Sequence, residues 1–372
     1  MKPGSLFCLC FLLLVSGRSP AQTETQRPYW FTLERGKFYF RQGAYGDALI
    51  AFEDARNQRR DQFMRMRRDM ITLLSAPEVR RLGDSLDLVE KYIAEERQLS
   101  AARALEELYY RVPRESLGGS ALRIPDELER FKDYPEAEYW IGETYRVEGE
   151  LGIALKQYQR TYELRDLLEA PGFVIPLLYR IADVHRLRQE YNEMENRLLE
   201  ILEGDSLWSG GSGSFARAAM TRTLENDGIN RFLTLYRYNK AEVLAAHRLL
   251  GFYYYASGRH GRAAEHLLFA FLIQNTILIE EITRNQFDYS FSTLDDLIAR
   301  VRSRPALSGY PEDMEYYKTM YYLGTAFYGD GKLGPARNFW NFLNQHSESG
   351  EWHGRAAAQL ARPAVERVLE MP

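Results

Sequence analysis

Small and apolar residues recur along the chain at spacings that place them on single faces of consecutive helices. In the clearest copy Gly251 precedes Tyr254 by three positions, so the two residues share one helical face. Gly258 then supplies a tight turn. Beyond the turn, small and large apolar residues follow at i, i+4 and i+7: Ala263, Leu267 and Ala270. The pattern predicts two helices folded into a hairpin, with small residues where the helices approach each other.

The same spacing returns at Gly36 and Tyr39, at Gly142 and Tyr145, and at Gly324 and Phe327. A fifth copy is looser because Met194 replaces the second-helix alanine. These residues resemble the tetratricopeptide repeat, a helix–turn–helix unit of 34 residues. A sixth, degenerate copy begins at Leu82. Aligned on the family pattern, the hairpins are expected near residues 29–62, 82–113, 135–168, 175–208, 244–277 and 317–350.

The resemblance implies an all-α fold, an α-solenoid in which each hairpin packs on its neighbours. The intervals between hairpin starts are uneven and exceed 34 residues. We therefore expect an irregular array over residues 22–372, with extra or lengthened helices between the hairpins.

Several segments outside the repeat pattern carry their own predictions. Residues 209–214 are glycine and serine only, and predict a flexible loop. Residues 263–284 predict one extended helix, whose Gln274 and Glu280 argue against a membrane span. Ser292 predicts a helix start. Residues 355–369 predict a closing helix that Pro363 interrupts or ends.

The first 21 residues are expected to be a secretory signal peptide. Lys2 is followed by an apolar run from Leu6 to Val15 and by a small-residue motif ending at Ala21. The alternative is a membrane anchor, for which the run is short. Both cysteines lie in this run, so a cleaved chain would have none. A large exported protein without cysteine fits the bacterial cell envelope, periplasmic or secreted.

No motif for catalysis, metal binding or cofactor binding stands out in the sequence. Residues 329–334 spell G-x-G-x-x-G, but they fall on a repeat turn and follow a helix rather than a strand. His247, His260 and His266 match no zinc spacing. A formal net charge of −4 argues against generic nucleic-acid binding. The sequence predicts a non-enzymatic protein with no catalytic residue, no metal site and no cofactor.

In the repeat family the first helices of the hairpins line a concave groove, and the resemblance transfers these positions mostly to tyrosines and arginines here. Such residues dominate binding hot spots, and arginine pairs with carboxylates. The expected groove residues are Lys37, Phe40, Arg41, Tyr139, Arg146, Tyr179, Arg186, Arg248, Tyr255, Tyr321 and Tyr328. The alternative is that these side chains only fill gaps between adjacent first helices.

Two functions fit these expectations. The first is a periplasmic protein–protein interaction scaffold or adaptor that binds an extended peptide or a helix of acidic or C-terminal carboxylate character. The second is a small-ligand carrier or an accessory of a periplasmic solute transporter. An open groove would favour the first function and a closed aromatic cavity the second. The sequence leaves the partner and the oligomeric state open.

Overall fold

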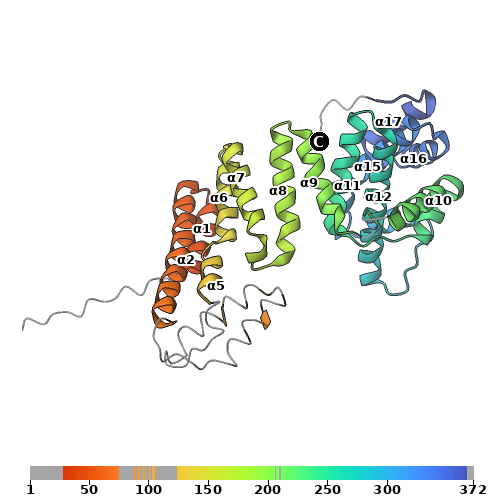
Figure 1. Ribbon diagram of the computed structural model, residues 1–372. Helices are drawn as coiled ribbons and strands as arrows, with labels where there is room; N and C mark the ends of the chain where they lie inside the picture. The colour runs from red at the N-terminus through yellow and green to blue at the C-terminus, as the bar shows by residue number, and fades with distance from the viewer. Residues whose placement is uncertain are drawn as a thin grey trace, which may run out of the picture. The chain divides into compact units, whose positions relative to one another are not determined.

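The computed structural model describes residues 28–74, 88, 91–92, 95, 97, 100, 103–104, 124–205, 207–208 and 211–366. Every regular element in these ranges is a helix, so the protein is all-α as the sequence predicts (Figure 1). The expected signal peptide lies outside the described residues, as does nearly all of the degenerate copy at 82–113.

The chain divides into two compact units, whereas the sequence predicts one array. The first comprises Met1–Glu148 with Asp166–Glu169, and the second Gly149–Arg165 with Ala170–Pro372. The first unit contains the helices α1 (Tyr29–Arg41), α2 (Tyr45–Leu74), α5 (Ile124–Arg130) and α6 (Pro135–Val147).

In the first unit, α2 packs against α1, α5 and α6. Its apolar side chains meet Leu33 of α1 and Ile141 of α6 in one core. Arg59 is buried in the same helix, where its Nε donates to the Phe131 carbonyl at 2.9 Å and its guanidinium lies 4.6 Å from the ring centre of Tyr134. The buried cation is therefore held by a backbone acceptor and an aromatic face.

The second unit is larger and its helices pack in sequence-adjacent pairs. Its elements are α7 (Leu151–Glu163), η3 (Arg165–Leu167, at the boundary between the units), η4 (Pro171–Phe173), α8 (Val174–Leu187), α9 (Tyr191–Glu203), α10 (Gly211–Leu235), η5 (Ala241–Val243), α11 (Leu244–Ala256), α12 (His260–Asn285), α13 (Leu294–Arg302), α14 (Tyr310–Asp313), α15 (Tyr316–Gly329), α16 (Leu333–Gln345), η6 (Ser347–Ser349) and α17 (Glu351–Ala361). The most extensive packing joins α8 to α9, α11 to α12, α12 to α15, and α15 to α16.

A helix begins within one residue of each clear repeat start: α1, α6, α8, α11 and α15. Each is followed by a three-residue turn and a second helix. The middle residue of each of these five turns has a positive φ, between 61° and 85°. It is Gln189 in the turn after α8 and glycine in the other four. The predicted turn chemistry therefore matches the backbone at four of the five positions.

In three of the copies the recurring spacing corresponds to a direct contact between the two helices. A Cβ added to Gly251 would lie 2.6 Å from the Leu267 side chain, which is closer than real Cβ atoms approach. The corresponding distances are 2.5 Å from Gly36 to Phe52 and 2.9 Å from Gly324 to Trp340. In all three pairs the large side chain of the second helix fills the space that the glycine of the first leaves.

The segments between the repeats differ partly from expectation. The flexible-loop prediction is wrong for residues 211–214, which form the first turn of α10; residues 209–210 lie outside the described ranges. The chain before α10 is anchored, because Asp205 accepts from the Leu207 amide and Trp208 stacks on His266. The extended helix is confirmed as α12.

Two helix ends differ in detail from the prediction. The start expected at Ser292 lies one residue later, where the Thr293 side chain caps α13 by accepting from the Asp296 amide. The closing helix runs over Glu351–Ala361, so it begins earlier than predicted and ends before Pro363.

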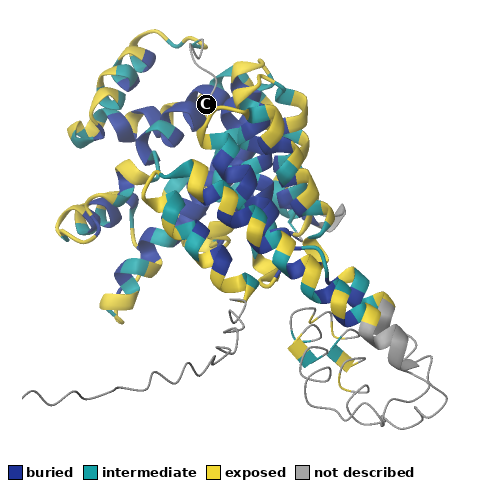
Figure 2. Ribbon diagram, turned by 90° about the vertical axis from the view of Figure 1, so that its left-hand side faces the viewer, coloured by how far each residue is buried: buried dark blue, intermediate teal, exposed yellow. Residues whose placement is uncertain are grey.

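Helix α12 is the one described helix long and apolar enough to cross a membrane by length and composition. Within the fold, 78% of its apolar window is buried. Figure 2 shows buried and exposed residues on different faces of the described helices. This burial is what a core helix of the second unit requires.

Two buried histidines face each other inside this core. His247 Nδ1 lies 3.2 Å from His266 Nδ1, and the Trp208 ring stacks on His266 with centroids 4.5 Å apart. Burial lowers the pKa of both imidazoles, that of His266 to about 3; Arg217 adds to the effect at both, as does His266 at His247. Both rings are therefore neutral at pH 7, so one nitrogen can donate to the other.

Replacing Gly251 with alanine tests the close helix contact. The added methyl must displace Leu267, so we expect a loss of roughly 1–3 kcal/mol in the free energy of unfolding. Gly354 in α17 is the matched control, because an added Cβ meets nothing within 4 Å. Gly354→Ala should stabilise the protein by up to about 1 kcal/mol. Denaturant unfolding of both variants measures the difference, and equal effects would contradict the packing account.

The histidine pair predicts acid sensitivity of the second unit. A buried base with a lowered pKa takes up its proton mainly on unfolding, so stability is retained above pH 6.5 and falls as the pH drops below it. Each histidine contributes a slope of up to about 1.4 kcal/mol per pH unit. His266→Phe should flatten the profile measured by urea unfolding between pH 4 and 7. Phe269→Leu destabilises the same core but should leave the slope unchanged.

Candidate functional site

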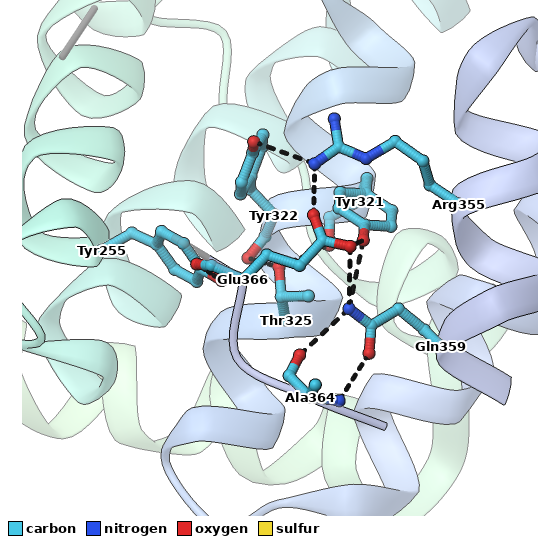
Figure 3. Close-up of polar contacts among 8 residues, drawn as sticks. All are labelled: Tyr255, Tyr321, Tyr322, Thr325, Arg355, Gln359, Ala364 and Glu366. Carbon is cyan, nitrogen blue, oxygen red and sulfur yellow. Dashed lines mark hydrogen bonds and ion pairs between the residues drawn. The ribbon is translucent and has the colours of Figure 1, made fainter. Parts of the chain in front are cut away.

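The chain after α17 turns back across α15 and contacts three helices with its backbone and one carboxylate (Figure 3). We call residues 363–366 the tail segment. Helix α17 ends at Ala361, and Arg362 has an extended backbone with φ −146° and ψ 88°. The residue before a proline avoids the helical region, so Pro363 fixes where the helix gives way to the tail segment.

Three side chains hold the backbone of the tail segment. The side-chain amide of Gln359 pairs with both backbone groups of Ala364: its Oε1 accepts from the amide at 2.9 Å, and its Nε2 donates to the carbonyl at 3.0 Å. Tyr328 donates its hydroxyl to the Pro363 carbonyl at 3.3 Å. Tyr255 donates to the Glu366 carbonyl at 2.8 Å. These hydrogen bonds involve only main-chain atoms of the tail segment, so they do not depend on the side chains of residues 363 and 364.

One side chain of the tail segment is recognised directly. The Glu366 carboxylate accepts from the Tyr321 hydroxyl and from Gln359 Nε2, and it pairs with the Arg355 guanidinium. Arg355 lies over the rings of Tyr321 and Trp352, at 4.6 and 4.7 Å from their centres. We call Tyr321, Arg355 and Gln359 the carboxylate receptor. It combines an ion pair, a phenol and an amide on one acidic group.

The electrostatics of the receptor favour an ionised carboxylate. Burial alone would raise the pKa of Glu366, but the hydrogen bond from Tyr321 and the pairing with Arg355 outweigh it, and the pKa lies below the usual value. Burial raises the pKa of Tyr255 to about 12, and the neighbouring Tyr322 and Glu366 also act in that direction. Tyr255 therefore remains a protonated donor at neutral pH.

Helix periodicity explains how these groups converge. Tyr321 and Tyr328 are seven positions apart on α15, and Arg355 and Gln359 are four apart on α17, so each pair shares a helix face. Tyr255 reaches the same place from α11. Figure 3 shows the side chains of all three helices directed at the tail segment.

Three of the expected groove residues thus meet at one place, Tyr255, Tyr321 and Tyr328. What they contact is the chain itself. All three also have substantial packing contacts, since Tyr255 and Tyr321 are buried and Tyr328 lies against Trp340.

Two other expected groove residues connect successive helical pairs. Tyr179 of α8 donates to the Glu242 carbonyl at 2.8 Å and accepts from the Ala246 amide at 3.0 Å, where α11 begins. Arg248 of α11 donates to the Met314 carbonyl at 3.0 Å, just before α15. These two side chains match the gap-filling alternative, because they hold the backbone that enters the next first helix.

The other expected groove residues have contacts within their own units. Arg186 pairs with Asp183 on its own helix. In the first unit, Lys37 pairs with Glu34, and Arg146 pairs with Glu143. Phe40 and Tyr139 pack edge-on against Trp140. Arg41 is exposed on α1.

Arg355 and Gln359 of the receptor, the bound Glu366 and the neighbouring Tyr322 were not among the residues predicted from the sequence. The spacing of Arg355 and Gln359 on one face of a short closing helix was a usable signal. The return of the tail segment onto α15 was not, since it depends on tertiary packing.

A pocket of about 500 Å³ lies beside the receptor and shares Arg355 with it. Its walls also include Tyr317, Trp352, Glu315 and Glu351. No residue of the tail segment lines this pocket. Among the described residues, no group of three or more histidine, cysteine, aspartate or glutamate side chains is arranged to hold a metal ion.

Comparison with known proteins gives relatives but no family. No family model matches the chain. An uncharacterized protein of Treponema pallidum (strain Nichols) is 23% identical over 355 residues, covering 94% of this chain and 95% of its own length. An uncharacterized protein of Borreliella burgdorferi is 21% identical over 224 residues, covering 55% of this chain and 69% of its own length. The first similarity spans both units.

Removing the Glu366 charge tests how the tail segment is held. Glu366→Gln loses the ion pair to Arg355, so the Ala364 amide should exchange with solvent at least several-fold faster at pH 7. Glu351→Gln makes the same change at an exposed position of α17 and should leave the exchange rate unaltered. Hydrogen exchange with mass spectrometry of the C-terminal peptide measures both.

Acid should release the tail segment in the unaltered protein. Because the pKa of Glu366 is lowered on docking, docking is favoured above the ordinary glutamate value of 4.5 and weakens as the pH falls through the lowered value. Exchange of the Ala364 amide, corrected for its intrinsic pH dependence, should therefore accelerate below about pH 4.5. An opening rate independent of pH would contradict the charge-assisted contact.

Proposed function

We propose that this protein is a non-enzymatic interaction scaffold of the bacterial cell envelope, built from irregular tetratricopeptide-like hairpins, that binds an extended acidic segment of a partner protein. The binding surface in the second unit is the face formed by α11, α15 and α17. The proposal rests above all on one observation: this face binds backbone groups of three residues of the tail segment and holds one carboxylate in a receptor.

The chemistry of this face suits peptide binding better than catalysis. Its donors are tyrosine hydroxyls, a glutamine amide and an arginine, which recognise carbonyls and carboxylates. The acceptors they meet are backbone carbonyls and a glutamate. Tyrosine and arginine supply both contact area and directed hydrogen bonds. A partner segment would therefore be recognised by its main chain and by a single acidic side chain.

The helical pairs support the repeat part of the proposal. Five first helices start near the positions that the repeat pattern predicts, and three close glycine contacts recur at the same internal spacing. The expected signal segment supports export, and the absence of cysteine after residue 10 suits a chain that functions without disulfides in the envelope.

A small-ligand carrier is the second candidate, favoured by a separate pocket of about 390 Å³ between α10 and α12. Arg217, Arg222 and Lys332 line it together with Glu225 and Glu265. Its size is within the range of small-molecule sites. Four of its charged side chains are already paired, Arg217 with Glu265 and Lys332 with Glu225, which leaves less of its charge for a ligand.

Site-specific photocrosslinking in the native envelope tests the scaffold. A photoreactive residue in place of Glu351, on the rim of the pocket beside the receptor, should give a defined protein adduct, identified by mass spectrometry. The matched position is Phe287, which is 94% exposed on the link between α12 and α13 and lies outside this face. Arg355→Ala should reduce the adduct at 351. Equal adducts at both positions, or none, would exclude this face as the partner surface.

A further inference from the structure

The tail segment occupies a site whose recognition features are more general than the segment itself. The backbone groups of Pro363, Ala364 and Glu366 are bound by Tyr328, Gln359 and Tyr255, yet the side chains of Ala364 and Val365 are exposed. A segment with other residues at these two positions would make the same hydrogen bonds. The requirement that the site imposes is a carboxylate at the position of Glu366.

We propose that Tyr321, Arg355 and Gln359 form a receptor for a glutamate in an extended segment of a partner protein, and that residues 363–366 occupy this receptor in cis as a competing pseudo-ligand. The inference rests on the proposed scaffold function and specifies its partner. The partner segment is an extended chain with a glutamate, and the backbone carbonyls two and three positions before that glutamate are available as hydrogen-bond acceptors.

The tail segment is held in a way that allows exchange. Its contacts are hydrogen bonds and one ion pair, and Val365 remains 44% exposed, so little apolar surface is buried on docking. Segments of this kind open at a small free-energy cost relative to the core. The helices beneath differ, because Tyr321 and Tyr255 are buried in the core that persists when the segment leaves.

A partner segment can gain contacts that the tail segment does not make. The pocket of about 500 Å³ beside Arg355 is lined by Tyr317 and Trp352 but by no residue of the tail segment. A longer ligand whose glutamate fills the receptor can place an adjacent side chain there. This additional burial favours the partner, while the effective concentration of the tethered tail favours the pseudo-ligand.

The competition sets the apparent affinity of the site. A ligand that binds only the open receptor has an apparent dissociation constant equal to the intrinsic value divided by the fraction of open receptor. A change that weakens the binding of the tail segment to the receptor therefore raises the apparent affinity for a partner without changing a residue of the receptor.

The probe for this competition is a fluorescein-labelled peptide with the sequence of residues 361–372, added to the full chain. Fluorescence anisotropy should show at least about tenfold tighter binding to the Glu366→Gln protein than to the unaltered protein, because the cis competitor is weakened. Ala364→Pro removes the amide that donates to Gln359 and should have the same effect by an independent route. Glu203→Gln, at an exposed position of α9 that belongs neither to the receptor nor to the pocket beside it, is the control for the charge change and should bind as the unaltered protein does.

Two further comparisons test the receptor itself. A peptide with glutamine in place of Glu366 should lose most of its affinity for the Glu366→Gln protein. Adding Arg355→Gln to that protein should abolish binding of the original peptide. Circular dichroism and thermal unfolding establish that each variant keeps its helices.

Each failure overturns a defined part of the proposal. If the labelled peptide bound the unaltered protein as tightly as the Glu366→Gln and Ala364→Pro proteins, cis competition would be overturned. Binding that ignores the peptide glutamate, or no binding to any variant, would overturn the carboxylate receptor. In these cases a protein adduct at position 351 in the crosslinking experiment would still support the scaffold function. The scaffold function and the pseudo-ligand can therefore fail separately.

Discussion

The contact on which the rest of the structure depends is the fit between a glycine of a first helix and a large side chain of its second helix. Gly36 with Phe52, Gly251 with Leu267, and Gly324 with Trp340 leave no room for even one added carbon. Close-packed interiors cannot absorb such a volume unless the neighbouring side chain or helix shifts. Each of these contacts therefore fixes the separation and the relative rotation of two helices, and with them the direction of every other side chain on the pair.

Once the rotation is fixed, side chains at equivalent positions of different helical pairs make similar contacts. Tyr179 and Arg248 occupy the same place in their first helices, and each binds the backbone where the following first helix begins. Within the second unit, a side chain placed between two successive helical pairs thus binds the backbone of the protein itself.

The helix pattern was readable because it depends on local geometry. Small and large residues at i, i+3 and i+4 mark helix faces, and glycine at the turn marks a positive φ, so the starts at 29, 135 and 244 could be placed from sequence. The receptor could not, because Glu366 reaches Tyr321 across 45 positions. Glycine and serine at 211–214 misled for a related reason: the flanking anchor at Trp208, a tertiary contact, lets a weak helix former begin α10.

The receptor arises where the series of pairs ends. Tyr321 has the same place in α15 that Tyr179 and Arg248 have in α8 and α11, but no further first helix follows it in the described part of the chain. Its hydroxyl therefore donates to Glu366 of the tail segment. Arg355 and Gln359 of α17 add a positive charge and an amide at the same place. Terminal elements of repeat arrays must satisfy polar groups that internal ones share with neighbours. The surface that we propose for partner binding is therefore the one where the tail segment, rather than another first helix, packs on α15.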